Sequence, residues 1–307
     1  MIKLKYTLRN DLLFKMVFTK FPNLLKILMS ELLSIDYKSI SQFEILNTEI
    51  PPEIFGTKFC RFDIIMRING RLVNLEIQNR DQGNFVERSL FNWAREYSTA
   101  LPMGEDYKDL PVTIVVSILN YNQFDHKEYH SEFHPLEVTH YMPLSDKMVM
   151  MYYELTKLPK RLDPNNLLEL LLHLFAADTE ADLAKIKKLE VSIMQEAIKA
   201  YQTVSNSAEF RELDRMLAKA RHDEAQALAH AKEEGRVEGE KIGLVKGKEE
   251  GKREGRVEGK REGRVEGKRE GTLAIAKNLL LINLPLDQIV KATGLTHEEV
   301  ETLRDAN

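Results

Sequence analysis

The chain has 307 residues, of which 43% are hydrophobic and 30% are charged, and its formal net charge is −4. This length accommodates one sizeable domain with an appendage, or two domains, and the charge provides no generally basic surface. The one cysteine, Cys60, excludes an intrachain disulfide and a cysteine-based structural zinc site. No signal-peptide core and no apolar run of about 20 residues is present, so we expect a cytoplasmic protein without a membrane span.

The N-terminal part of the chain predicts two helices and a strand. Either Asn10 or Asp11 can cap the first helix, and Phe21-Pro22 ends it. Apolar residues at helical spacing predict the second helix over residues 24–33, and a strand is expected around residues 43–46.

A β-hairpin is expected next. Two β-rich runs, residues 59–68 and 71–78, are separated by Asn69-Gly70, a pair that favours a tight hairpin turn because both of its residues tolerate a positive φ. With a two-residue loop, facing positions sum to 139, which places Asp63 opposite Glu76. Gln78 shares the face of Glu76 because side chains alternate along a strand.

The polar side chains of this hairpin suggest a metal site. An ionised carboxylate in a mostly apolar strand is costly unless it is paired or bound to a cation. Asp63 and Glu76 are cross-strand neighbours that can share one ion, and Mg²⁺ prefers one or two carboxylates together with water and phosphate. The alternative is that both are solvated acids on a surface hairpin.

The region after the hairpin mixes helix and strand patterns. We expect a helix over residues 83–101, a buried strand over 112–119, a polar loop over 121–136, and strands around 136–142 and 148–155. Together with the preceding elements, this order describes an α/β sandwich of about 160 residues.

Beyond Pro159 only helical patterns follow, over residues 167–177, 183–201 and 209–231. Between residues 235 and 271 glycine occupies every fourth position, mostly after glutamate and often before lysine or arginine. Each interior glycine costs nearly 1 kcal/mol of helix propensity relative to alanine, whereas a Glu–Arg pair returns only about 0.2–0.5 kcal/mol. We predict a marginal helix that acts as a spacer, with rapid amide exchange. Its four-residue step drifts around the helix axis, so no coiled-coil seam is encoded.

The C-terminal segment predicts three short helices, over residues 273–280, over 286–293, and after a capping box of Thr296 and Glu299. Gly294 separates the last two, as in a helix-turn-helix. The third helix is acidic, which is unfavourable for phosphate contact, so we favour a protein-contact module over a DNA reader. We divide the chain into a domain over residues 1–158, a helical region over 159–232, the spacer over 233–271 and the helical module over 272–307.

The hairpin motifs resemble those of a known family: Arg61-Phe62-Asp63-Ile64 and Val73-Asn74-Leu75-Glu76-Ile77-Gln78. The resemblance begins near residues 10–15 and continues after the hairpin through motifs in residues 88–97, 104–107, 110–112 and 118–121. The sequence resembles the PD-(D/E)XK nuclease superfamily, and within it the Rpn-like recombination-promoting nucleases, a branch also described as transposases. The likeness covers roughly residues 6–155. The glycine-repeat tail with its small helical module also resembles members of this family.

The resemblance implies a restriction-endonuclease-like α/β core and cleavage of DNA phosphodiester bonds that depends on Mg²⁺ or Mn²⁺. It assigns the metal to Asp63, Glu76 and the backbone carbonyl of Ile77. Gln78 stands at the third catalytic position, where many members of the superfamily have lysine, although glutamine is common in this branch. Lysine also stabilises negative charge, whereas a neutral amide only hydrogen-bonds. This departure is compatible with slow turnover and does not require inactivity.

Other candidate residues are weaker. Asp11 is either a supporting acid or a plain helix cap. Three basic residues are either phosphate contacts or solvated charges: Lys58, Arg80 and Arg88. Four histidines show no acidic partner at a suitable spacing, so we expect no metal there: His126, His130, His134 and His140. Glu49 and Glu53 are interpreted as loop acids and not as metal ligands.

The leading hypothesis is a metal-dependent DNA endonuclease of low sequence specificity that acts in DNA recombination or transposition. The alternative is a catalytically weak or inactive nuclease fold that serves as a scaffold. In either case the helical tail is expected to bind a protein partner or a second copy of the chain.

Overall fold

The computed structural model describes residues 2–46, 63–81, 83–101 and 103–305. The chain forms two compact units, Met1–Ala225 and Gln226–Asn307. The features expected at Glu49, Glu53, Lys58 and Cys60, and the first four residues of the run 59–68, lie outside the described residues.

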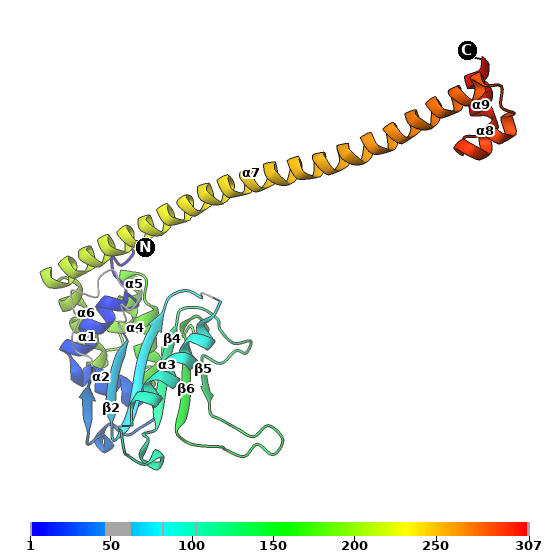
Figure 1. Cartoon of the computed structure of the whole chain (residues 1–307). Helices are drawn as coiled ribbons and strands as arrows, with labels where there is room; N and C mark the ends of the chain where they lie inside the picture. The colour runs from blue at the N-terminus through cyan, green and yellow to red at the C-terminus, as the bar shows by residue number, and fades with distance from the viewer. Residues whose placement is uncertain (1, 47–62, 82, 102, 306–307) are drawn as a thin grey trace. The chain divides into compact units, whose positions relative to one another are not determined.

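A six-stranded mixed sheet is the centre of the first unit (Figure 1), with the strand order β1-β2-β3-β4-β6-β5. The strands are β1 (Phe43–Ile45), β2 (Ile64–Ile68), β3 (Arg71–Gln78), β4 (Thr113–Leu119), β5 (His130–Phe133) and β6 (Met148–Glu154). The pairs β3–β4 and β4–β6 are parallel, and the other pairs are antiparallel. The crossover from β3 to β4 contains α3 (Phe85–Thr99).

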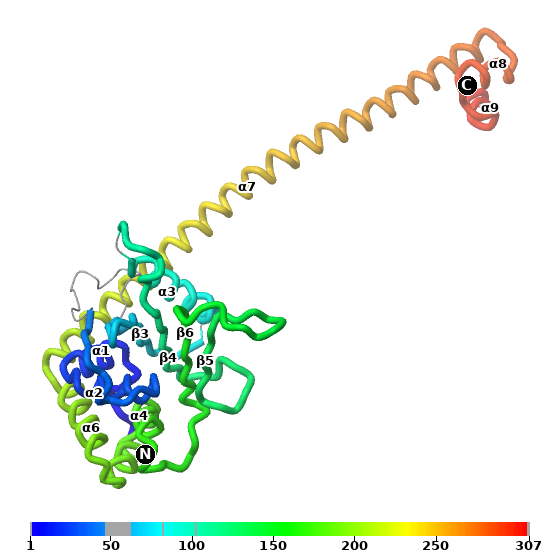
Figure 2. The backbone as a smooth tube through the Cα atoms, turned by 90° about the horizontal axis from the view of Figure 1, so that it is seen from below, coloured from blue at the N-terminus to red at the C-terminus, as the bar shows by residue number. Residues whose placement is uncertain are grey.

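Helices cover both faces of this sheet (Figures 1 and 2). One face packs against α1 (Asp11–Lys20), α2 (Pro22–Leu32), α4 (Leu167–Ala176) and α6 (Ser192–Ser205), and α5 (Glu180–Lys187) joins the same core. The opposite face packs against α3. Along β3, Val73, Leu75 and Ile77 enter the larger core, so the alternating residues Asn74 and Glu76 face α3. The predicted α/β core followed by an all-α region is confirmed.

Local interactions explain where several elements begin and turn. The Oδ1 atom of Asn10 accepts a hydrogen bond from the backbone N–H of Leu13 at 2.9 Å, so Asn10 caps α1, and the alternative that Asp11 is the cap is wrong. Asn69 and Gly70 have φ values of 46° and 75°, as the tight turn requires. Ile64 pairs with Leu75, which is the predicted register.

Two sequence-based expectations about the middle of the chain are wrong. Residues 136–142 do not form a strand, and the strand β5 lies instead within the expected loop 121–136. Pro135 has no N–H to donate to a ladder, and the carboxylate of Glu137 accepts from the N–H groups of Thr139 and His140, which favours a turn.

The expected single helix over residues 183–201 is also wrong. The segment forms part of α5 and most of α6, with a break in which Glu190 has a φ of 55°. Thr179 and Asp182 form a capping box that begins α5 before the predicted start. Short 3₁₀ turns occupy Tyr37–Ser39, Tyr107–Asp109 and Leu155–Lys157.

The helix α7 (Ala208–Leu281) begins in the first unit and continues through the whole glycine repeat. The repeat is therefore helical as expected, while its rapid amide exchange stays a prediction. In the second unit, α8 (Leu286–Thr293), α9 (His297–Asp305) and the end of α7 enclose a small core of Ala276, Ile289, Leu295 and Val300.

Gly294 ends α8 with a φ of 73°, and the predicted capping box of α9 is confirmed by reciprocal hydrogen bonds between Thr296 and Glu299. No described helix combines the length and apolar character needed to cross a membrane. The boundaries proposed after residues 158, 232 and 271 stay predictions.

Candidate functional site

The candidate residues gather at the carboxyl end of β3. Glu76 and Gln78 are among the last three residues of this strand. Asp63 lies one residue before Ile64, so the register that pairs Ile64 with Leu75 places it opposite Glu76. In open α/β sheets, ligands bind beyond the carboxyl ends of the parallel strands. The hairpin thus presents both acids where such a site is expected.

Glu76 is held by a residue that the sequence did not single out. Its side chain is buried, and its strand neighbour in β4 is Ser117. The hydroxyl of Ser117, itself 0% exposed, donates a hydrogen bond to Oε1 of Glu76 at 2.8 Å. This bond restricts rotation of the carboxylate. The available clue was the single polar residue, Ser117, in the otherwise apolar run 114–119 of this strand.

Further polar side chains lie beyond Ser117, on β6 and α3. Tyr152 is the neighbour of Ser117 in the next strand, and its hydroxyl lies 2.8 Å from Oγ of Ser89 in α3. Burial raises the pKa of Tyr152, the Ser89 hydrogen bond opposes this, and the charge of Glu76 adds to it. The tyrosine therefore stays neutral, and Glu76 is close enough to affect it.

Side-chain hydrogen bonds fix the start of α1 at the same end of the sheet. The amide of Asn79, directly after β3, donates to the carbonyl oxygen of Arg9 at 2.6 Å. The guanidinium of Arg9 donates to Oδ1 of Asn120, directly after β4, at 2.7 Å. Asp11 is the first residue of α1, so it begins the helix near the ends of both strands.

The carboxyl group of Asp11 has a pKa raised by burial, and the negative charge of Asp63 contributes to the rise. Burial raises the pKa of Asp11 to about 6, the positive charge of Arg221 opposes this rise, and the negative charge of Asp63 adds to it. Oδ2 of Asp11 lies 3.7 Å from Nη2 of Arg221. Burial of Asp11 is partial, because 41% of its side chain is exposed.

This set of acids fits a divalent cation. Asp63 and Glu76 face each other on one hairpin, and the repulsion between Asp11 and Asp63 would be relieved by a positive ion. Among the described residues, no three acidic, histidine or cysteine side chains lie together as a complete ligand group. A Mg²⁺ site needs only one or two carboxylates, with water and phosphate as further ligands. The carbonyl ligand assigned to Ile77 stays a prediction.

The basic candidates lie in different surroundings. Arg80 is exposed two residues after β3, and Lys58 lies outside the described residues. The guanidinium carbon of Arg88 lies 5.2 Å from the centre of the Phe85 ring on α3. Arg221 was missed because α7 is rich in charged residues, and no local pattern distinguishes this arginine from its neighbours.

The four histidines have separate surroundings. Nε2 of His126 lies 2.8 Å from Oγ of Ser131, and Nε2 of His134 lies 2.6 Å from Glu132. The ring of His140 contacts Glu137, and that of His130 stacks on Tyr153. The structure therefore does not bring these four residues to one point.

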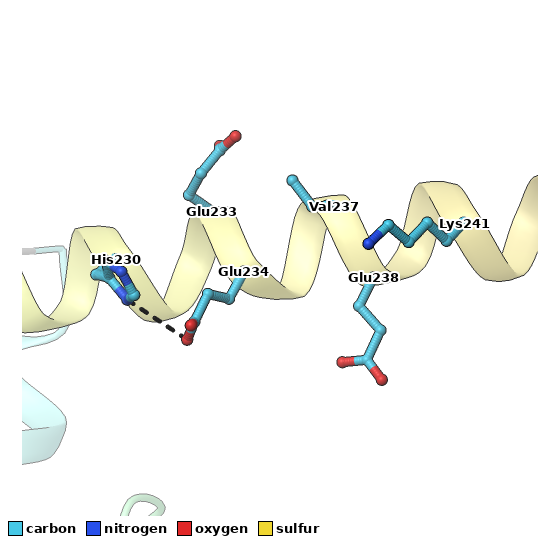
Figure 3. A pocket seen from close by; sticks show the side chains of 6 residues that line it. All are labelled: His230, Glu233, Glu234, Val237, Glu238 and Lys241. Atoms are coloured by element: carbon cyan, nitrogen blue, oxygen red, sulfur yellow. Dashed lines mark ion pairs between the residues drawn. The ribbon is translucent and has the colours of Figure 1, made fainter.

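Neither of two surface hollows contains a candidate residue. One is lined by six residues of α7 alone (Figure 3): His230, Glu233, Glu234, Val237, Glu238 and Lys241. A single helix supplies only one wall, so this hollow cannot enclose a ligand. The other, of about 390 Å³, lies between α6 and the junction of α1 and α2, at the opposite end of α1 from Asp11.

Comparison with known proteins assigns the chain to a family. A family model described as PD-(D/E)XK nuclease family transposase matches residues 8–231. The match extends beyond the expected residues 6–155 and includes α4, α5, α6 and the first turns of α7. Comparisons with curated proteins and with solved structures gave no match. Because the family model covers most of the chain, this protein belongs to the PD-(D/E)XK nuclease family transposases.

Proposed function

We propose that the protein is a Mg²⁺-dependent DNA endonuclease of low sequence specificity that acts in DNA recombination or transposition. Family membership supports the nuclease chemistry and a DNA substrate. The observation that carries the proposal is the register of the hairpin, which sets Asp63 opposite the buried Glu76 at the carboxyl end of β3. Mn²⁺ has the same ligand preferences and would serve as a substitute cofactor.

Each residue of the site has a separate role in this proposal. Asp63 and Glu76 would hold the metal with the carbonyl oxygen of Ile77, and Asp11 would support it. The bound metal would act as a Lewis acid on the phosphate and would lower the pKa of a water molecule. Gln78 would orient the attacking water by hydrogen bonding. Candidate contacts to other phosphates are Lys58, Arg80 and Arg88.

Nicking of supercoiled plasmid DNA tests this function. The wild-type protein should nick the plasmid with Mg²⁺, and EDTA should stop the reaction. Asp63→Ala and Glu76→Ala should each abolish nicking. Glu44→Ala provides a matched control, because Glu44 is an exposed acid on β1 of the same sheet and should be dispensable. Wild-type activity in the Asp63 and Glu76 variants would remove the assignment.

The alternative is an inactive scaffold, and the neutral Gln78 is the observation that favours it. In that case a calorimetric titration would detect no binding of Mg²⁺ or Mn²⁺ at millimolar concentration. A helical tail that recruits a protein partner or a second copy of the chain belongs to this alternative, and it is also compatible with an active enzyme. A cytoplasmic location stays an expectation.

A further inference from the structure

A positive charge reaches the candidate site from a distant part of the sequence. Arg221 belongs to α7, and its Nη2 atom lies 3.7 Å from Oδ2 of Asp11. The charge of Asp63 acts on the same carboxyl group of Asp11. The guanidinium group of Arg221 is therefore a neighbour of Asp11, the proposed supporting acid, on which the charge of Asp63 also acts.

The contact between Arg221 and Asp11 is too loose to serve mainly as a structural lock. Its length exceeds the roughly 2.7–2.9 Å of a charge-assisted hydrogen bond, and the two side chains are 60% and 41% exposed. Exposed ion pairs of this kind contribute little to stability. Arginine has five N–H donors in a planar fork that matches phosphate oxygens, so one loose contact leaves capacity for a phosphate.

The chemistry of the site calls for such a charge. Cleavage of a phosphodiester places negative charge on the phosphate oxygens, and an arginine or lysine side chain that reaches the phosphate stabilises that charge. Gln78 donates a hydrogen bond but carries no charge. A second source of positive charge would therefore compensate for the neutral residue at position 78.

We propose that Arg221 binds the DNA phosphate that is cleaved and supplies the positive charge that Gln78 lacks. This inference rests on the proposed nuclease function and adds to it a residue from α7.

Single-turnover nicking of plasmid DNA at saturating Mg²⁺ measures this role. Arg221→Ala should slow the reaction by about 10²–10³-fold, as for the loss of one donor to developing charge. Arg221→Lys should recover part of the rate. Arg215→Ala is the matched control, because Arg215 lies on the same helix, 2.7 Å from Glu212, and this variant should keep the wild-type rate.

A compensating substitution makes the test specific. Gln78→Lys should raise the rate of the Arg221→Ala variant at least about tenfold, and by more than it raises the rate of the wild type, because only in the variant does it replace a lost charge on the phosphate. Absence of any recovery would overturn the inference. So would wild-type speed in Arg221→Ala while Asp63→Ala is inactive, a result that leaves the nuclease function intact. Absence of nicking by the wild type would instead remove the proposed function, and the role of Arg221 with it.

Metal binding in the absence of DNA shows whether Arg221 acts through its charge on the phosphate or by holding Asp11 in place. In a calorimetric titration with Mn²⁺ alone, Arg221→Ala should bind the ion at least as tightly as the wild type, because removing a nearby positive charge favours a cation. Weaker Mn²⁺ binding by this variant would show that Arg221 acts by holding Asp11 in place, and would overturn the inference.

Discussion

At the scale of single residues, the buried carboxylate of Glu76 is oriented by a hydrogen bond. It lies among apolar strand residues, where an ionised group needs a partner, and Ser117 in the adjacent strand provides a hydrogen bond of 2.8 Å. Loss of a group that orients a metal ligand in this way typically lowers metal affinity about 10–100-fold. Ser117 is therefore a positioning residue in this account.

Removal of this hydroxyl should weaken the metal site. We expect Ser117→Ala to lower Mg²⁺ affinity by about 10–100-fold, since Glu76 loses the bond that orients it. Calorimetric titration of the metal-free protein measures this. Ser89→Ala serves as a control, because Ser89 is an equally buried hydroxyl that contacts Tyr152 instead of an acid. An equal loss of affinity in both variants would assign the effect to packing.

Asp11 makes the stability of the metal-free protein depend on pH. Burial is the main cause that raises its pKa from 3.8 to about 6. The positive charge of Arg221 opposes this rise, and the negative charge of Asp63 adds to it. Between these pH values the folded state keeps a proton that the unfolded state has lost. The contribution of Asp11 to stability should therefore fall as pH rises from about 4 to about 6 and then level off.

The substitution Asp11→Asn isolates this effect because asparagine cannot ionise. In EDTA, the melting temperature of the wild type should fall relative to that of Asp11→Asn between about pH 4 and about pH 6, by calorimetry. The difference should be constant above that range. Parallel melting curves at every pH would show that burial of Asp11 has no energetic consequence.

At the scale of elements, the turn Asn69-Gly70 fixes the register on which the site depends. Both residues have positive φ, and Oδ1 of Asn69 accepts from the N–H groups of Ser41 and Gln42 at 3.0 and 3.1 Å. The turn thus connects the hairpin to the segment that leads into β1. A shift of one residue would turn every side chain of β2 to the opposite face and would separate Asp63 from Glu76.

A side chain at position 70 should be costly for conformational reasons alone. A Cβ atom there would meet no atom within 4 Å, but a φ of 75° is a backbone conformation that alanine rarely adopts. We expect Gly70→Ala to lower the free energy of unfolding by about 1–2 kcal/mol, measured by urea denaturation. Gly247→Ala, in the exposed repeat of α7, should cause no loss. An unchanged urea midpoint for Gly70→Ala would contradict this account of the turn.

At the scale of the whole molecule, local chemistry explains what the sequence could predict. The hairpin register followed from one two-residue turn, and the alternation in β3 followed from its apolar pattern. The strand β5 was missed because its residues, His130 to Phe133, are mostly polar and are ordered by pairing with β6. Ser117 and Arg221 were missed because their partners lie 41 and 210 positions away along the chain.

The sequence alone did not show that the helices after Pro159 pack with the α/β core. Helices α4, α5 and α6 share a core with α1 and α2, and they lie within the stretch that the family model matches. The first turns of α7 then bring Arg221 to Asp11. Long-range packing of this kind leaves no local pattern in the sequence, whereas turns and caps do.

The central claim is that Asp63 and Glu76 together hold one divalent cation. Binding of Mn²⁺ to the metal-free protein, followed by electron paramagnetic resonance, tests it most directly. The wild type and the control Glu44→Gln should bind the ion equally well. Asp63→Asn and Glu76→Gln should each bind it at least about tenfold more weakly, because the site loses one of its charged ligands. Equal Mn²⁺ affinity in all four proteins would contradict the account.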